Sequence, residues 1–317
     1  MTNLRDLVDN QGTSYSEFKR KLKINDSVLV KNLLISVSMI LFSIFLFYLS
    51  KSNFFVSLIL LLPITLWISF WKQAYKMHFH EAAHFNLSND KKINDFLANI
   101  LFTPFTGMWI GNYRSSHWKH HQYLGDFEDT EVSYHKPISA FEVIKKLTGV
   151  YLLQTVHRYF KNFKKNSLSD DFKNKKNYGL LSSISFMLLV QSSIILLLLF
   201  SVSFLCAISW AISIVIFDPF ISGIRQTLEH RSEYALNNID YSKVRHGPSN
   251  RIFGNDFFSR HFGGAGFNKH LLHHYDPSIS YTEFEKLEKY LLTTVLSDEI
   301  KKNTTSYFKT FNKIITK

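Results

Sequence analysis

The sequence predicts an all-α integral membrane protein with four transmembrane helices, arranged as two hairpins below a cytosolic helical cap. Mean hydropathy over the 317 residues is near zero, because nearly apolar stretches are averaged with segments rich in Lys, Asn and Asp. The basic residues are concentrated outside the apolar stretches, and most of the histidines lie in small groups in the same polar segments. These observations predict a membrane protein with large soluble parts.

Four apolar stretches have the length of a membrane-spanning helix, which needs about 17–25 residues. None of them contains Lys or Arg, and they cover residues 33–49, 54–71, 180–200 and 203–221. Buried core helices are the alternative, but apolar runs in such helices are usually about 10–14 residues long. Length and charge therefore favour four spans.

The distribution of Lys and Arg predicts the orientation of these spans. The link between the first two spans carries Lys51 alone, and the link between the last two carries no cation. The other Lys and Arg lie in residues 1–31, 72–179 and 222–317. Because cytosolic loops carry an excess of Lys and Arg, we expect both termini on the cytosolic side.

The segments outside the spans are expected to complete a single domain. Residues 1–31 form an N-terminal cytosolic arm, residues 72–179 and 222–290 the cap, and residues 291–317 a C-terminal tail. Residues 96–110 and 141–163 are apolar but short or interrupted by Pro, Gly or charge, so we expect helices lying at the membrane interface.

Cysteine usage and charge indicate the surroundings of the chain. The single cysteine, Cys206, permits no internal disulfide, so the soluble parts are expected in a reducing compartment. The polar N-terminus shows no pattern of a removable signal peptide. The net charge of +12 comes from scattered basic residues beside apolar runs, which indicates a lipid bilayer rather than nucleic acid as the partner.

Nine of the 14 histidines fall in four groups, all in segments assigned to the cytosolic side. Within each group they are spaced mainly at i, i+3 or i+4, which places side chains on one helix face about 5–6 Å apart. Neighbouring imidazoles can then bind one ion or adjacent ions. The groups are His80 and His84; His117, His120 and His121; His230; and His270, His273 and His274.

Other interpretations of these histidines remain open. A lone pair at this spacing is usually an ordinary surface or core feature, and His78, His135, His157, His246 and His261 are left in that class. The stretch from His80 to His84 reads HExxH, the zinc protease signature with Glu81 as general base, but it would leave most grouped histidines without a role. One Glu-x-x-His alone is too little for a soluble di-iron bundle. A membrane metal store is a non-enzymatic alternative.

The histidine groups resemble those of the membrane fatty acid desaturase family. The family pattern is HxxxH, HxxHH and (H/Q)xxHH, separated by transmembrane helices, and it is matched by residues 80–84, 117–121 and 270–274. Asn94-Asp95 after the first box and Pro277 after the third are also similar to the family. The resemblance covers residues 71–281.

The resemblance implies two iron ions (Fe2+/Fe3+) held mainly by histidine, with O2 as co-substrate. His230 would be the additional ligand found in acyl-CoA members. There an Asn four residues earlier reaches iron through water, and Gln226 takes that place here. Each ligating imidazole also needs its other N–H held by an acceptor. The acidic run at residues 126–131 fits a solvated loop equally well, but it supplies several of the candidate acceptors, which are Glu81, Glu229, Asp126, Glu128 and Asp129.

The same resemblance implies an acyl-lipid, acyl-CoA or acyl-carrier-protein substrate and a separate electron donor, either a ferredoxin or a cytochrome with its reductase. The His-Pro-Gly-Gly motif of fused cytochrome b5 is missing, and His246-Gly247-Pro248 does not match it. Histidine-box hydroxylases and carotenoid ketolases are close alternatives. In the sterol desaturase group the first two boxes lie close together, whereas more than thirty residues separate His84 from His117, which favours the fatty acid desaturases.

Overall fold

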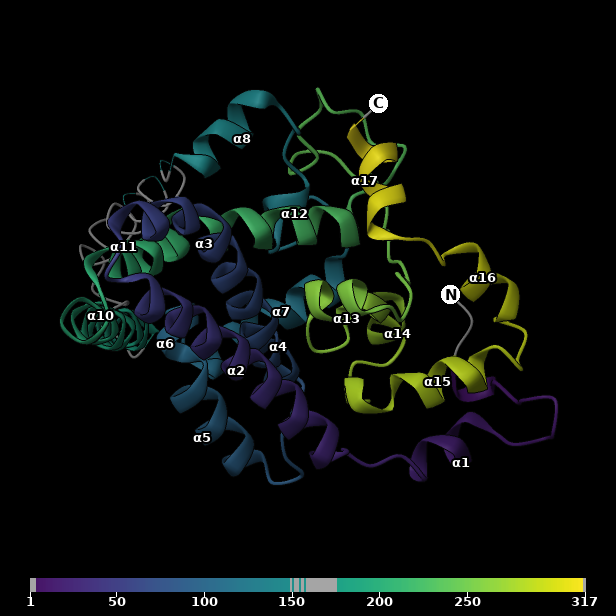
Figure 1. The fold of residues 1–317 in the computed structure, drawn as a ribbon. Coiled ribbons are helices and arrows are strands. Elements are labelled where there is room, and N and C mark those ends of the chain that lie inside the picture. Colours follow the sequence, from purple (N-terminus) through teal and green to yellow (C-terminus); the bar gives the residue numbers. More distant parts are fainter. Residues whose placement is uncertain (1–3, 149, 151–153, 155–156, 158–175, 316–317) are drawn as a thin grey trace.

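The computed structural model describes residues 4–148, 150, 154, 157 and 176–315, and this part of the chain is helical (Figure 1). It contains no β-strand, only two isolated bridges between Val8 and Ser14 and between Ile252 and Thr304. Four of the described helices are long and apolar enough to cross a membrane. The predicted fold class, an all-α protein with four spans, is therefore confirmed.

The first hairpin consists of α2 (Asp26–Ser50) and α3 (Phe54–Lys76), so its helices are longer than the apolar runs that predicted them. Asn53 begins α3 because its side chain accepts a hydrogen bond from the backbone N–H of Val56. The hydroxyls of Ser50 and Ser57 lie 2.8 Å apart and close the turn. Beyond Met77 the chain continues directly into α4 (His78–Ala83), which carries the first histidine box.

The second hairpin consists of α10 (Lys176–Ser201) and a composite second arm. That arm begins with α11 (Phe204–Ile212), continues through the π-helical turn η4 (Ser213–Phe217) and ends with α12 (Asp218–His230). Ser203 forms the turn without Gly or Pro, because its hydroxyl caps the backbone N–H of Cys206. The arm extends to His230, well past the predicted end of the span at residue 221.

The α3 helix lies at the centre of the membrane region, where it packs against α2, α11 and α12. Phe47, Ile68, Trp71 and Trp210 are buried between these helices. The opposite faces present large exposed apolar side chains, including Phe55 and Phe200. Lipid would cover such surfaces, since soluble monomers rarely expose apolar patches this extensive. This is the side-chain distribution of a membrane protein.

An ion pair joins the two helices that lead to the histidine groups. Nζ of Lys72 and Nζ of Lys76 on α3 lie 3.4 Å and 3.3 Å from Oδ2 of Asp218, at the start of α12. Nζ of Lys72 also donates to the Ser213 hydroxyl at 2.8 Å. Breaking a buried pair leaves an uncompensated charge, so this contact strongly favours one relative placement of α3 and α12.

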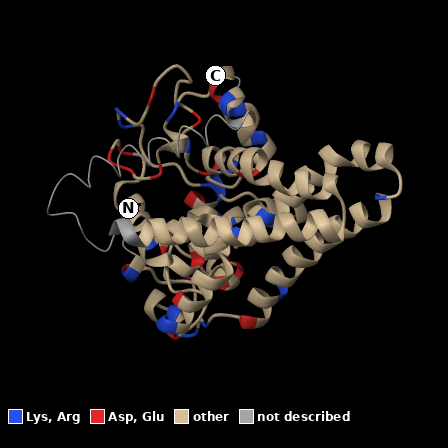
Figure 2. Cartoon of the chain, turned by 90° about the vertical axis from the view of Figure 1, so that its left-hand side faces the viewer, with Lys and Arg blue, Asp and Glu red and all other residues tan. Residues whose placement is uncertain are grey.

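Shorter helices form the part of the structure that lies outside the four long apolar helices. In Figure 2 the charged residues gather there, at one end of the long helices, and the opposite end is almost free of them. The remaining helices are α1 (Tyr15–Arg20), α5 (Lys91–Leu101), α6 (Thr103–Thr106), α7 (Ile110–Tyr123), α8 (Ala140–Leu147), α13 (Phe257–Gly263), α14 (His270–Tyr275), α15 (Phe284–Leu291), α16 (Ser297–Lys302) and α17 (Tyr307–Ile315).

The structure corrects one of the two predicted interfacial helices. Residues 96–110 are not one helix, because α5 ends at Leu101 and the short α6 stops at Gly107, whose φ of 67° is left-handed. A new helix, α7, then starts at Ile110. Of residues 141–163, the structure describes α8 and a few later positions, and the rest lies outside the described residues.

The N-terminal arm packs against the C-terminal part of the chain. The hydroxyl of Tyr15 donates to Asp276 at 2.7 Å, and Nζ of Lys19 lies 2.6 Å from the same carboxylate. Phe18 stacks on Tyr290 with 4.2 Å between ring centroids. The two ends of the chain therefore share one hydrophobic core with α4 and α14.

Candidate metal centre

Four helices bring the nine grouped histidines together. The short α4 extends from α3, and α12 is the end of the second hairpin, so two of the four helices continue from membrane spans. In Figure 1, α4, α7 and α14 lie in the middle of the molecule, and α12 runs above them in this view. Helical spacing within each box keeps the imidazoles on the inward face, where all except His121 and His274 are buried.

The first histidine group comprises five residues from α4 and its C-cap, α7 and α14. One ring nitrogen of each lies within 4.8 Å of the corresponding nitrogens of the others. Nε2 of His121 is 3.0 Å from Nε2 of His117 and 3.0 Å from Nε2 of His273. Metal–nitrogen bonds are about 2.0–2.1 Å long, so nitrogens on one ion lie roughly 3–4 Å apart. This five-histidine group is His80, His84, His117, His121 and His273.

The second histidine group comprises His120, His230 and His274, whose ring nitrogens also lie within 4.8 Å of one another. His270 adjoins it, because its Nε2 is 2.9 Å from Nε2 of His230 and 3.0 Å from Nε2 of His274. The rings of His121 and His274 connect the two groups, with centroids 4.6 Å apart. The structure therefore brings all nine predicted residues to two adjoining positions.

Several of these imidazoles have a buried ring nitrogen with no partner. Both nitrogens of His80 and of His84, and Nε2 of His120, make no hydrogen bond in the structure. A buried polar atom without a partner is costly, and native structures contain few of them. Neutral imidazole is a good ligand for iron, zinc and copper. The donors and their geometry fit metal ions at both positions.

Two carboxylates from the loop after α7 orient one imidazole of each group. Nδ1 of His120 lies 2.9 Å and 3.0 Å from the two oxygens of Asp129, and Nδ1 of His117 lies 2.9 Å from Oε1 of Glu131. Burial alone raises the pKa of Asp129, but hydrogen bonds from His120 and Tyr134 lower it more, so the carboxylate stays ionised. Each contact directs Nε2 of its imidazole toward the group.

The other acidic candidates do not hold an imidazole by a hydrogen bond, although Glu229 lines a small cavity beside both groups. Oε1 of Glu81 is 3.7 Å from Nδ1 of His80, and its other oxygen accepts from the backbone N–H of Tyr281. Glu229 pairs with Arg225 and Asp126 with Arg245, and Glu128 is exposed. Among the described residues, none of these last three forms a hydrogen bond or ion pair with a grouped histidine. Glu131 is the partner that sequence reasoning missed, although it ends the same acidic run.

The backbone around the first box is braced from α5 and α7. The guanidinium of Arg114 donates to the carbonyls of Ala82 and Ala83 and pairs with Asp95. Asn94 donates to the Ala82 carbonyl at 2.9 Å. Phe85, directly after His84, has a φ of 62°, an uncommon conformation for an aromatic residue. The family-like Asn94-Asp95 pair therefore serves to hold the turn that ends the first box.

A small cavity of about 20 Å³ lies beside both groups, lined by Met77, Tyr113, Gln226 and Phe267 together with five of the histidines. A volume near 10–15 Å³ already accommodates one water molecule. The side chain of Gln226 donates to Glu131, which holds its amide at this cavity. The position is compatible with the expected water-mediated contact.

The five ungrouped histidines do not belong to either group. The ring nitrogens of His78 form hydrogen bonds with the Tyr75 carbonyl and the Tyr281 hydroxyl. His261 packs on Trp71. His135 and His246 pack against each other with ring centroids 5.2 Å apart. His157 is exposed.

Comparison with known proteins agrees with this geometry. The family profile described as "Fatty acid desaturase" matches residues 56–304, which is most of the chain and includes every grouped histidine. No individual curated protein matches. Buried histidines at two adjoining positions, four apolar helices and the profile match lead to one conclusion: the chain belongs to the fatty acid desaturase family.

Proposed function

We propose that this chain introduces a double bond into a fatty acyl chain, using nine histidines to hold two iron ions. The reaction removes two hydrogens from adjacent methylene carbons and consumes one O2, two electrons and two protons, with two waters as the other product. The observation that carries the proposal is the convergence of nine imidazoles at two adjoining positions within a chain of this family.

The proposed ligands are the five-histidine group at one position and His120, His230, His270 and His274 at the other. When bound, iron supplies the capacity to activate O2 against an unactivated C–H bond. Asp129 and Glu131 hold His120 and His117 in the tautomer that leaves Nε2 free to ligate. Gln226 holds a water molecule at the edge of the site.

The membrane orientation completes the proposal. Both termini and the metal centre face the cytosol, because the basic residues lie on that side of the spans. The substrate is an acyl-lipid, acyl-CoA or acyl-carrier protein, whose apolar chain approaches from the bilayer. The two electrons come from a separate ferredoxin, or from a cytochrome with its reductase.

The experiment is mass spectrometry of lipids from cells that express the chain in a host supplying iron and an electron donor. We expect an unsaturated product two mass units lighter than its precursor, absent with the His120→Ala variant. His157→Ala is the matched control, since His157 is exposed and outside both groups. It should leave the product unchanged.

The product also separates the alternatives. An added hydroxyl raises the precursor mass by sixteen units, and a carotenoid ketone would appear in the pigment fraction, so either result would replace desaturation by oxygen insertion. Identical profiles for the parent and His120→Ala, with both proteins folded and present in the membrane, would refute the proposal.

A further inference from the structure

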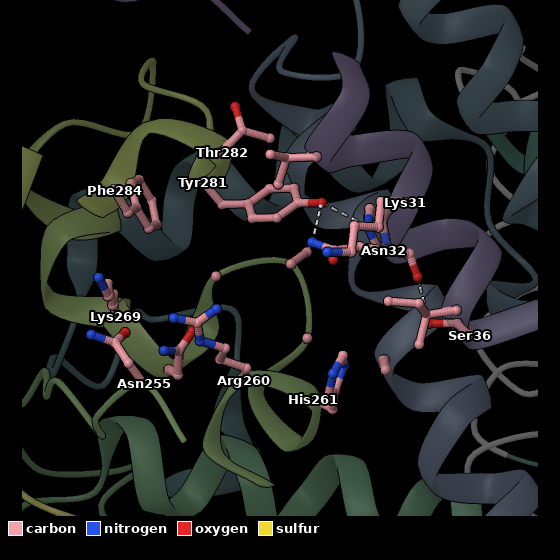
Figure 3. Close-up of a pocket in the computed structure, with 18 of the residues that line it drawn as sticks. Lys31, Asn32, Ser36, Asn255, Arg260, His261, Lys269, Tyr281, Thr282 and Phe284 are labelled. Carbon is pink, nitrogen blue, oxygen red and sulfur yellow. Dashed lines mark hydrogen bonds between the residues drawn. The ribbon is translucent and has the colours of Figure 1, made fainter. Parts of the chain in front are cut away.

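A cavity of about 370 Å³ with both polar and apolar lining residues lies beside the start of α2 and outside the metal centre. Figure 3 shows Lys31 and Asn32 on one side of it, and Asn255, Arg260 and Lys269 on the opposite side. Its wall includes His78 and Ala265, close in sequence to His80 and Phe267 at the metal centre. No residue of either histidine group lines it.

The lining of this cavity is cationic. Lys31, Arg260 and Lys269 carry positive charge, and Glu285 is the one carboxylate among the lining residues. Lys269 is buried and already neutralised by Glu288 at 2.7 Å, whereas Arg260 and Glu285 form an exposed pair at 3.0 Å. Exposed pairs of this kind contribute little, so Arg260 remains available to a competing anion.

Lys31 marks the level of the cavity relative to the bilayer. It directly precedes the apolar run of α2, which places its ammonium at the expected membrane surface. Among the described residues, no ion pair of Lys31 is found. A cation at this level is well placed to contact lipid phosphates.

A groove continues from the cavity along α2. It is an open groove of about 610 Å³ that is lined by α2 alone and shares Lys31 and Ile35 with the cavity. Leu34 and Met39 line it farther along the helix, and Asp26 and Val30 line its end nearer the N-terminus. A ligand that fills both spaces therefore has an anionic head and an apolar tail directed into the bilayer.

We propose that this cavity binds the phosphate of a membrane lipid headgroup, with the acyl chains of the lipid lying in the groove along α2. Lys31 and Arg260 bind the phosphate, and the amides of Asn32 and Asn255 are neighbouring hydrogen-bond donors. Free phosphate shares the head chemistry, but it would leave the apolar groove unused. The proposal goes beyond the proposed function and does not depend on it.

Native mass spectrometry of the full chain in neutral detergent tests the proposal. The probes are phosphatidylglycerol, phosphatidylcholine, diacylglycerol with the same acyl chains, and inorganic phosphate. We expect both phospholipids to bind more tightly than diacylglycerol. Lys31→Gln/Arg260→Gln should weaken phospholipid binding about tenfold, because each change removes a charge-assisted hydrogen bond.

Two further variants are informative. Lys286→Gln/Lys289→Gln removes two exposed lysines of α15 that do not line the cavity, and it should bind phospholipid like the parent. Glu285→Gln removes the competing carboxylate and should tighten binding. Unchanged melting temperatures will show that the variants fold.

Equal phospholipid binding by the parent and Lys31→Gln/Arg260→Gln would overturn the proposal, and so would diacylglycerol binding as tight as that of the phospholipids. Inorganic phosphate that binds with the same dependence on Lys31 and Arg260, and that phosphatidylglycerol fails to displace, would overturn the assignment to lipid.

Discussion

The two histidine groups are held in place in different ways. In the five-histidine group, His80 and His84 have no hydrogen bond to either ring, and their helix is braced through backbone carbonyls by Arg114 and Asn94. In the second group, His120 is held directly at its ring by Asp129. Both groups therefore have one imidazole held by a carboxylate, His117 by Glu131 in the first and His120 by Asp129 in the second, and the first has backbone support in addition.

Their origins also differ. The five-histidine group takes His80 and His84 from the end of the first hairpin, where α4 continues from α3, whereas the second group takes His230 from the end of the second hairpin. Lys72 and Asp218 fix that arm against α3. The relative position of the two groups therefore depends on packing between membrane helices, which predicts unequal responses to substitution.

Removing a ligand gives the largest expected effect. His230→Ala leaves three imidazoles at the second position, those of His120, His270 and His274, whereas His84→Ala leaves four in the five-histidine group. We expect His230→Ala to lose the ion at its position. Its activity should fall more than about 100-fold, a larger loss than that expected for a residue that only orients a ligand. Metal analysis of both purified variants measures this. If His230→Ala and His84→Ala lost the same amount of metal, the two positions would not differ in the number of their ligands.

Removing an orienting carboxylate gives the next largest effect. Asp129→Asn should lower metal affinity or activity roughly 10–100-fold, because the carboxylate holds His120 and also accepts from Tyr134. Glu131→Gln should act at the first group through His117. Metal titration of each variant measures the affinity. Glu128→Gln, at an exposed position of the same loop, is the control and should match the parent.

Removing the brace of the first group gives the smallest effect. Burial raises the pKa of Asp95, but hydrogen bonds from Arg114 and Asn94 lower it more, and its folded pKa lies below the usual value. The stabilisation is therefore complete above about pH 3.9 and is lost as pH falls through the lower folded pKa. Because Asp95 is about one-third exposed, Asp95→Asn should cost at most about 1 kcal/mol near pH 7.

Melting curves of Asp95→Asn and the parent across this pH range test the sign. The difference between the two proteins should be present at pH 7 and vanish in acid. A difference that grows as the pH falls would contradict the assigned role of the carboxylate. The pH 7 values also show whether the brace on α4 contributes to overall stability.

Local patterns in the sequence account for most of the fold and for the histidine set. Runs of apolar residues identify spans because length and hydrophobicity are properties of contiguous residues, and four such helices are present. The histidine spacings specify which imidazoles share a helix face, and those nine residues lie together in the structure. The π-helical turn between α11 and α12 is a feature that no periodicity indicates.

Tertiary structure alone decided which acidic residues form hydrogen bonds with the grouped histidines. Asp126, Glu128, Asp129 and Glu131 lie in one irregular loop, where no repeat fixes the direction of a side chain, and only packing directs Asp129 and Glu131 inward. The cavity beside Lys31 likewise depends on residues more than two hundred positions apart, such as Asn32 and Tyr281. By itself the sequence determined the four apolar helices and the set of grouped imidazoles, because both are encoded over short distances. Long-range contacts decided the partners, the spacing of the two groups and the cavity.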